Sequence, residues 1–243
     1  GASMRKVARI ITIAVLAVST GCGNAQDTAL ITSLERLAKT HNAEAIYHLG
    51  MAYQTGSGVA EDHAKALDAF RKAAALGDPL ASYKLGCYYD GQGAGLVSPD
   101  AKLALQYKLI AAKAGYALAQ QDVGTLYAQS GDVSAGLIWL EKSAAQGWAG
   151  GLMMLASVYN GAAGIKPDAA KTAAYFQIFL ARSEPSKEQT EWLSRFEEHL
   201  SPGDKKRADD IVRSYHPSPT QLTLKGLSGQ RAARALVQKD SHD

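Results

Sequence analysis

Cysteine is nearly absent from this sequence. Its 243 residues include only two cysteines, Cys22 and Cys87. Two cysteines cannot form the several bridges that hold small secreted domains together, so a disulfide-based scaffold is excluded. The fold must therefore be stabilised by packing, and the chain is long enough for a sizeable core or for a short array of repeats.

Net charge is also small. Three of the 26 basic residues, Arg5, Lys6 and Arg9, precede the first acidic residue, Asp27, and lie in the N-terminal leader described below. The remaining 23 basic residues equal the 23 acidic residues in number. A near-neutral mature chain lacks the electrostatic signature of a nucleic-acid-binding protein, so we expect no nucleic-acid partner.

Bulky apolar residues are scarce as well. Phenylalanine occurs only 4 times, and alanine and glycine dominate the apolar content over valine and isoleucine. Small side chains favour closely packed helices, whereas sheets are rich in β-branched and aromatic residues. The composition therefore favours an all-α fold.

Motifs for catalysis or metal binding are missing from the sequence. The six histidines form neither an HExxH motif nor a Cys/His pair at metal-ligand spacing, and no serine stands in a nucleophile elbow. The glycine-rich stretch 91–95 follows a helical segment and lacks the Gly-Lys-Ser/Thr ending of a phosphate-binding loop. We therefore expect no enzyme activity, no cofactor and no metal site.

The N-terminus has the form of an export signal. Residues 1–3, Gly-Ala-Ser, precede Met4 and read as a cloning remnant. A basic segment (MRKVAR) and a short apolar run (IITIAVLAV) follow. The apolar run is too short to span a bilayer and fits the hydrophobic part of a signal peptide. Export from the cytoplasm is the expectation.

The end of this signal allows two cleavage sites. Ser19-Thr20-Gly21-Cys22 resembles the lipobox of bacterial lipoproteins, apart from Ser19 where that family usually has Leu. The resemblance implies lipidation of Cys22, and Gly23 in the second position implies the outer membrane as its location. The alternative is cleavage after Ala25, which would give a soluble periplasmic protein. A third possibility is that the segment is not cleaved and remains as an anchor. The intact mass of the protein in the membrane fraction distinguishes the three possibilities.

A fixed spacing of Asp, Gly and Tyr recurs along the chain. In three places an Asp is followed by Gly 15 residues later and by Tyr after 12 more. The sets are Asp62, Gly77 and Tyr89; Asp100, Gly115 and Tyr127; Asp132, Gly147 and Tyr159. The blocks between them are Ala-rich with helical spacing, which predicts a repeated two-helix unit. Only the distance from Tyr to the next Asp varies, from 5 to 11 residues, as expected of a loop between paired helices.

This pattern divides the chain into segments. Residues 1–25 are the remnant and signal peptide, and 26–41 form an N-terminal capping helix. Four repeats are predicted at 42–79, 80–117, 118–149 and 150–185, followed by a closing helix pair at 186–216. Residues 217–243 are rich in Pro, Ser and Thr with weak periodicity, so we predict a flexible tail there.

Individual positions have predicted roles. Asp62 is expected to cap the second helix of the first repeat, Ser98 to cap that of the second repeat, and Gly77 to end a helix in the left-handed conformation. The tyrosines of the spacing, together with Tyr53, are expected to pack between repeats with their hydroxyls bonded to loops.

Three glycines lie inside predicted helices. Gly50, Gly86 and Gly124 occupy one phase of the repeat, although glycine inside a helix costs about 1 kcal/mol relative to alanine. The expected gain is close approach of the paired helix, where a methyl group would collide. The small residues at 73–74, 111–112 and 143–144 are the predicted facing surface.

Together these residues resemble the Sel-one-like repeat (SLR) family, a relative of the tetratricopeptide repeat. The first repeat carries almost the whole pattern: Leu49, Gly50, Tyr53, Gly56, Gly58, Val59, Asp62, Lys65, Ala66, Phe70, Ala73, Ala74 and Gly77. The resemblance covers about residues 43–183. It implies a right-handed α-solenoid that binds other proteins.

One face of the first helices is the candidate partner surface. It lies opposite the Leu/Tyr positions and varies between repeats: Tyr47, Met51, Tyr83, Cys87, Gln121, Thr125, Met153 and Ser157. Tyr and Met are common at protein-binding surfaces. The alternative is that this face packs on neighbouring helices. Nothing cationic except Lys84 adjoins Cys87 in sequence, so an inert thiol is favoured there.

Several functions fit these expectations. The first is an exported, monomeric protein–protein interaction module, either a scaffold of an envelope assembly or an immunity protein that blocks a secreted effector. Small exported SLR lipoproteins resemble immunity partners of secreted phospholipases. A β-lactamase-like enzyme is the alternative, although Ser183-Glu184-Pro185-Ser186 lacks the Lys of a Ser-x-x-Lys motif. Binding of peptidoglycan or polysaccharide through the concave face is the third possibility.

Overall fold

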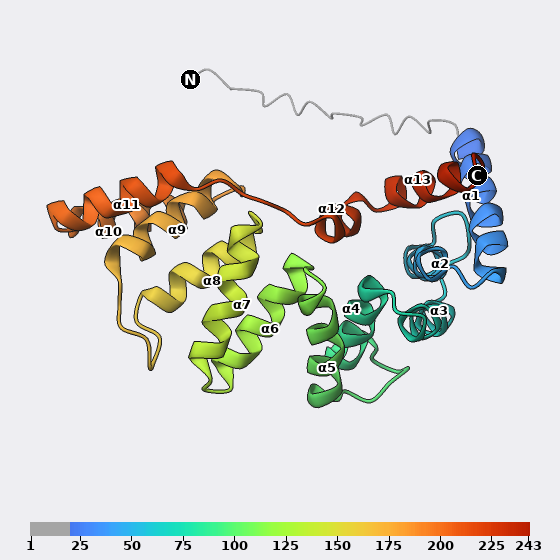
Figure 1. Ribbon diagram of the computed structural model, residues 1–243, viewed down its shortest axis with the longest axis horizontal. Coiled ribbons are helices and arrows are strands. Elements are labelled where there is room, and N and C mark those ends of the chain that lie inside the picture. The colour runs from blue at the N-terminus through green and yellow to red at the C-terminus, as the bar shows by residue number, and fades with distance from the viewer. Residues whose placement is uncertain (1–19) are drawn as a thin grey trace, which may run out of the picture.

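The computed structural model describes residues 20–243, and the side chains from residue 25 onward. Most of the predicted signal peptide and the side chain of Cys22 lie outside the described part. Between residues 20 and 243 every regular element is helical, and the helices form an arc (Figure 1). No helix of this part is long and apolar enough to cross a membrane.

Four antiparallel helix pairs build the arc. They are α2 (Ala43–Thr55) with α3 (His63–Ala75), α4 (Pro79–Cys87) with α5 (Ala101–Lys113), α6 (Ala117–Gln129) with α7 (Val133–Ala145), and α8 (Ala149–Tyr159) with α9 (Ala169–Ala181). Each helix contacts the next along the chain. The N-terminal helix α1 (Thr20–Lys39) packs on α2. The predicted all-α solenoid of tandem repeats is confirmed.

The repeated aspartates hold each pair together in the same way. Asp62, Asp100, Asp132 and Asp168 cap α3, α5, α7 and α9, each carboxylate accepting from the amide three residues on. The amide of each Asp also donates to the carbonyl of the preceding repeat tyrosine at 2.9–3.0 Å. The same bond closes the loop between the paired helices in every repeat, whatever the length of that loop. This explains why Tyr and Asp recur in the sequence while the number of residues between them varies. The prediction of Ser98 as a cap is wrong, because Asp100 caps α5.

The repeated glycines fix the junctions between pairs. Gly77, Gly115 and Gly147 have φ angles of 95°, 98° and 83°, in the left-handed region that favours glycine. The residue after each glycine donates its amide back to the last turn of the preceding helix, for example Asp78 to the carbonyl of Ala73 at 3.0 Å. This is the C-terminal helix motif predicted for Gly77, and Gly115 and Gly147 share it.

The glycines inside the helices allow close approach, as predicted. A Cβ at Gly50 would lie 2.6 Å from Phe70, and one at Gly124 would lie 2.8 Å from Leu140 and 2.9 Å from the carbonyl oxygen of Gly136. The predicted facing residues were wrong, however. Phe70, Lys108 and Leu140, at one position of the second helix, fill this space instead of the small residues at 73–74, 111–112 and 143–144.

The repeat tyrosines lie between repeats. Tyr159 stacks on Tyr175 of its own repeat with ring centroids 6.1 Å apart, and its hydroxyl donates to Glu141 of the preceding repeat at 2.9 Å. Tyr89 stacks on Tyr107 and accepts from Arg71 in the same arrangement. Each hydroxyl bonds a side chain of the preceding second helix, and that of Tyr159 also accepts from Lys171 at 3.4 Å; neither bonds a loop as expected.

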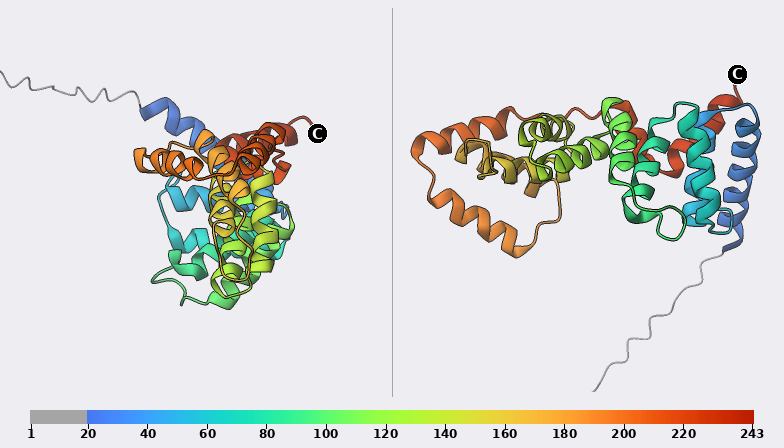
Figure 2. Two further views of the ribbon diagram at one scale, coloured as in Figure 1. Left: turned by 90° about the vertical axis from the view of Figure 1, so that its left-hand side faces the viewer. Right: turned by 90° about the horizontal axis from the view of Figure 1, so that it is seen from below.

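The chain continues past the repeats without losing order. Helices α10 (Lys187–Glu198) and α11 (Pro202–Ser214) pack on α9 through a cluster that includes Trp192, Leu193 and Ala208. Then residues 216–243, which we call the C-terminal strap, form α12 (Gln221–Ser228) and α13 (Gln230–Asp240). The strap runs back across the open side of the arc and meets α1 at the other end (Figures 1 and 2).

The predicted flexible tail is therefore wrong. Thr223 is 2% exposed and Ala233 is 3% exposed, with Ala233 packed among Leu30, Leu34 and other residues of α1 and α2. Lys225 pairs with Glu44 at 3.1 Å, and Arg234 pairs with Asp27 at 2.8 Å. The order comes from contacts with distant parts of the chain, which local composition does not reveal.

A buried polar network fastens the strap to the middle of the arc. The Thr223 hydroxyl donates to the side-chain oxygen of Gln146 at 2.7 Å and accepts from the amide of Ala117 at 3.0 Å. The side-chain nitrogen of Gln146 donates to Gln120 and to the carbonyl of Gly115. The Thr220 hydroxyl also donates to the carbonyl of Gly115, at 2.7 Å. One network thus connects the second repeat, the third repeat and the strap.

We expect Thr223→Val to lower the free energy of unfolding by about 1–3 kcal/mol. Valine keeps the shape of threonine but leaves the buried Ala117 amide without its acceptor, and an unsatisfied buried donor costs about that much. Urea unfolding followed by circular dichroism measures the loss. The control Thr223→Ser keeps the hydroxyl and should lose only about 0.8 kcal/mol for one methyl group. A valine variant as stable as the parent would contradict the role of this network.

Candidate functional site

We call the side of the repeats that is lined by their first helices, α2, α4, α6 and α8, the inner face; α6 and α8 are in direct contact. Two of the predicted partner-binding residues on these helices are buried. Tyr47 is 6% exposed and packs against Phe70, and Cys87 is 5% exposed. Neither can meet a partner at the surface, so the prediction is wrong for both. Cys87 was expected to be inert, and burial does raise the pKa of its thiol.

Other predicted residues link neighbouring first helices. The Tyr83 hydroxyl on α4 donates to the carboxylate of Asp122 on α6 at 3.1 Å. The indole N–H of Trp148 donates to Gln121 at 2.6 Å. The hydroxyl oxygen of Thr125 is enclosed and has no hydrogen-bond partner among residues 25–243. This part of the face therefore packs between repeats, which was the alternative interpretation.

Two predicted residues are open to solvent. Met153 is 36% exposed, and Ser157 is exposed one turn further along α8. They border a hollow of about 310 Å³ together with Phe176 and Trp192. Met51, in the first repeat, is half-buried and borders a separate cavity under the strap. The accessible inner face thus begins near α6 and extends over α8.

A buried lysine lies beside this face. Lys108 on α5 is 4% exposed, and its stem crosses Gly86 of α4 so closely that a Cβ there would lie 2.6 Å from its Cγ. Its ammonium group bonds Asp90 at 2.7 Å and Asp122 at 3.1 Å. Tyr83 bonds the same oxygen of Asp122. We call Tyr83, Cys87, Asp90, Lys108 and Asp122 the lysine cluster.

A π-helical turn places Asp90 in this cluster. The turn, η1 (Tyr88–Gln92), follows directly on α4, and Gly91 within it has a φ angle of 112°. Such turns are rare and frequently occur at functional sites. The Asp90 and Asp122 side chains are 47% and 30% exposed, so both carboxylates can reach solvent or a partner while holding the lysine.

The surroundings of the cluster favour the charged form of Lys108. Desolvation opposes the charge of Lys108, but the hydrogen bond to Asp90 and the charge of Asp122 outweigh it, so the pKa of Lys108 is raised. Burial raises the pKa of Tyr83, and the neighbouring Cys87 and Asp122 add to that shift. A charged lysine and neutral phenol are suited to binding rather than to proton transfer. Among the described residues no group of three or more His, Cys, Asp or Glu can hold a metal ion.

Lys108 was missed at the sequence level, although a signal for it exists. It stands 8 residues after Asp100, where the other repeats have Phe70, Leu140 and Phe176. A lysine at an otherwise apolar repeat position indicates a buried charge that needs partners. Asp90 and Asp122, the partners, could not be assigned from spacing, since they belong to different elements.

The four helix pairs match a model of the Sel1 repeat at residues 43–78, 79–116, 117–148 and 149–179, which together cover more than half of the sequence. The chain belongs to the Sel1 repeat family. Members of this family are protein-interaction modules, and the solenoid described above is the fold of that family. A search of curated protein sequences gives no significant match.

Two solved structures show the same fold. A Sel1 repeat protein from Oxalobacter formigenes is similar over 78% of this chain and 80% of its own, with 25% identity and a TM-score of 0.62. The protective antigen c5321 of uropathogenic Escherichia coli, which has an SLR fold, is similar over 85% of this chain and 44% of its own, with 23% identity and a TM-score of 0.61. The immunity protein Pa5087 of Pseudomonas aeruginosa gives 22% identity and a TM-score of 0.46, over 84% of this chain and 80% of its own.

Proposed function

We propose that this Sel1 repeat protein is exported and binds one protein partner through its inner face, from the lysine cluster to Met153 and Ser157, without catalysis of its own. The observation that carries the proposal is the lysine cluster. A charge buried at an apolar repeat position costs desolvation energy. Its two carboxylates stay partly open at the inner face, where a partner can use them.

The chemistry of this face suggests what the partner presents. The carboxylates of Asp90 and Asp122 suit an Arg or Lys side chain, and the hollow beside Met153, Phe176 and Trp192 suits an apolar or aromatic one. Asp122 lies on α6 and Met153 lies on α8, and these two helices touch each other. A partner segment with a basic residue near a bulky apolar residue is therefore the best fit.

Of the two roles considered, immunity is the one we propose. The strap ties the second repeat, the third repeat and α1 together, so the inner face is preformed. Preformed surfaces bind more tightly because less ordering occurs on association. Tight binding of a single secreted effector suits an immunity protein, whereas a scaffold of an envelope assembly is expected to bind several partners weakly.

Export and anchoring complete the proposal. The leader sequence supports lipidation of Cys22 and an outer-membrane location, with a soluble periplasmic form as the alternative. An effector delivered to the periplasm would meet the protein there.

The test is co-purification of the full chain from its own cells with Ser157→Arg, matched to Ser134→Arg on α7. Both serines are exposed, but only Ser157 lies on the inner face. We expect one stoichiometric partner, reduced at least tenfold by Ser157→Arg and unchanged by Ser134→Arg. Growth should then depend on the protein only when that partner is present. Several weakly bound partners would favour the scaffold role, and equal loss in both variants would overturn the inner-face assignment.

A further inference from the structure

A cavity of about 250 Å³ lies where the strap meets the first repeat. Four helices enclose it: α1, α2, α12 and α13. Its walls are mainly apolar and include Leu30, Leu34, Met51 and Ala233. Engineered apolar cavities of about 150 Å³ hold a benzene molecule, so this one has room for a chain of roughly eight carbons.

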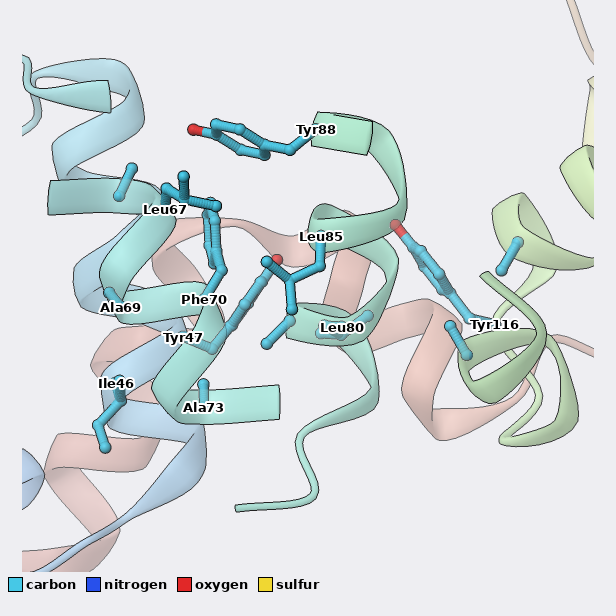
Figure 3. Packing of buried hydrophobic residues seen from close by; sticks show 14 of the residues in the cluster. Ile46, Tyr47, Leu67, Ala69, Phe70, Ala73, Leu80, Leu85, Tyr88 and Tyr116 are labelled. Atoms are coloured by element: carbon cyan, nitrogen blue, oxygen red, sulfur yellow. The ribbon is translucent and has the colours of Figure 1, made fainter. Parts of the chain in front are cut away.

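One polar group in this cavity has no partner. Tyr47 lines the cavity and is 6% exposed, yet its hydroxyl makes no hydrogen bond within residues 25–243. The hydroxyl oxygen is not among the atoms fully enclosed by protein, and the cavity is the space that its side chain borders. Figure 3 shows the ring extending from α2 toward Leu80 and Leu85 of α4. Buried hydroxyls are normally bonded, so this one is free to bind a ligand.

The charges around Tyr47 limit what that ligand can be. Burial raises the pKa of Tyr47, and the neighbouring Tyr116 and the carboxylates of Asp78 and Glu44 add to the shift. A negative charge at this hydroxyl is therefore unfavourable. Lys225, which lines the cavity, is already paired with Glu44 at 3.1 Å, and His48, which also lines it, bonds the same carboxylate at 3.3 Å. An uncharged head group fits this environment better than a carboxylate.

We propose that this cavity is a binding site for a small uncharged amphipathic molecule. The apolar body, of about eight carbons, lies against α1 and Met51, and a hydroxyl, carbonyl or amide group bonds the Tyr47 hydroxyl. The site is separate from the inner face of α6 and α8 and does not depend on the partner proposed there.

The test is a titration of the full chain with 1-octanol, followed through the labelled methyl groups of its methionines. The sequence has four methionines, of which Met51 borders the cavity while Met153 and Met154 lie in the fourth repeat as internal controls. We expect a saturable shift of the Met51 signal with Met153 and Met154 unchanged. Tyr47→Phe should weaken binding about five- to tenfold, on the scale of one neutral hydrogen bond. Tyr53→Phe, on the same helix but outside the cavity, should not.

Octanoate should bind more weakly than 1-octanol. Unchanged Met153 and Met154 signals in each variant show that it is folded, and direct nuclear Overhauser contacts between octanol and Met51 locate the ligand without any variant. Non-saturable shifts, equal shifts at all three methionines, unchanged affinity in Tyr47→Phe, or tighter binding of octanoate would each overturn the proposal.

Discussion

Phe70→Ala should lower the free energy of unfolding by about 3–5 kcal/mol. Phe70 is completely buried, it fills the space above Gly50, and its ring lies within 6.0 Å of both Tyr47 and Tyr88, measured between centroids. Alanine leaves a cavity that the surrounding helices cannot fill, because Gly50 has no side chain to move into it. The variant therefore loses both the free energy of burying the phenyl ring and the free energy that the empty cavity costs.

The matched control is Phe176→Ala. Phe176 occupies the same repeat position but is only partly buried, next to Trp192 and the hollow on the inner face. Chemical denaturation should give a clearly smaller loss for this variant than for Phe70→Ala. A loss below about 1.5 kcal/mol at Phe70, or a larger loss at Phe176, would show that this position does not hold the paired helices together.

Lys108→Ala should cost about 3 kcal/mol, and Lys108→Met only about 1 kcal/mol. Alanine removes both the buried stem, at about 0.8 kcal/mol per methylene, and the ion pairs with Asp90 and Asp122. Methionine keeps the stem and removes only the charge. Because the two carboxylates are 47% and 30% exposed, solvent screens them and the charge contributes modestly.

The charge contribution should also depend on pH in a defined direction. The pKa of Lys108 is raised in the folded state, so its stabilising effect is complete below the ordinary lysine value of 10.5 and is lost as the pH rises through the folded-state pKa. The stability difference between the parent and Lys108→Met should therefore be constant from neutral pH to about pH 10 and shrink above it. A methionine variant as stable as the parent at neutral pH would show that the ion pairs of Lys108 with Asp90 and Asp122 add no net stability.

Local sequence signals predicted most of the solenoid. The cap formed by Asp62 and the left-handed conformation of Gly77 depend on three to six neighbouring residues, so a single sequence reveals them, although the cap of α5 was predicted at Ser98 and lies at Asp100. The order of the strap was not predictable in this way. Thr223 is held by Gln146 and by the amide of Ala117, both distant in sequence, and its own neighbourhood resembles a linker.

The candidate site was predictable only in part. Met153 and Ser157 are exposed, as expected of a binding face, but the exposure of a residue on a repeated helix depends on what the next helix brings against it. Tyr47 is buried because Phe70 packs on its ring. The hydroxyl of Tyr83 is already hydrogen-bonded, because it donates to the carboxylate of Asp122 on the next first helix. The sequence pattern shows on which face of its own helix a residue lies, whereas the side chains of the adjacent helix determine whether that residue is buried.

Site-specific photo-crosslinking tests the proposed binding face most directly. A photoreactive amino acid is placed at Met153 on the inner face and, as the matched control, at Ile138 on α7, which is 56% exposed. After irradiation of intact cells we expect one crosslinked protein partner from position 153 and none from position 138. The same partner should disappear when Asp122→Lys is added to the Met153 probe. Crosslinks of equal strength from position 138, or none from position 153, would contradict the assignment of the inner face as the site of partner binding.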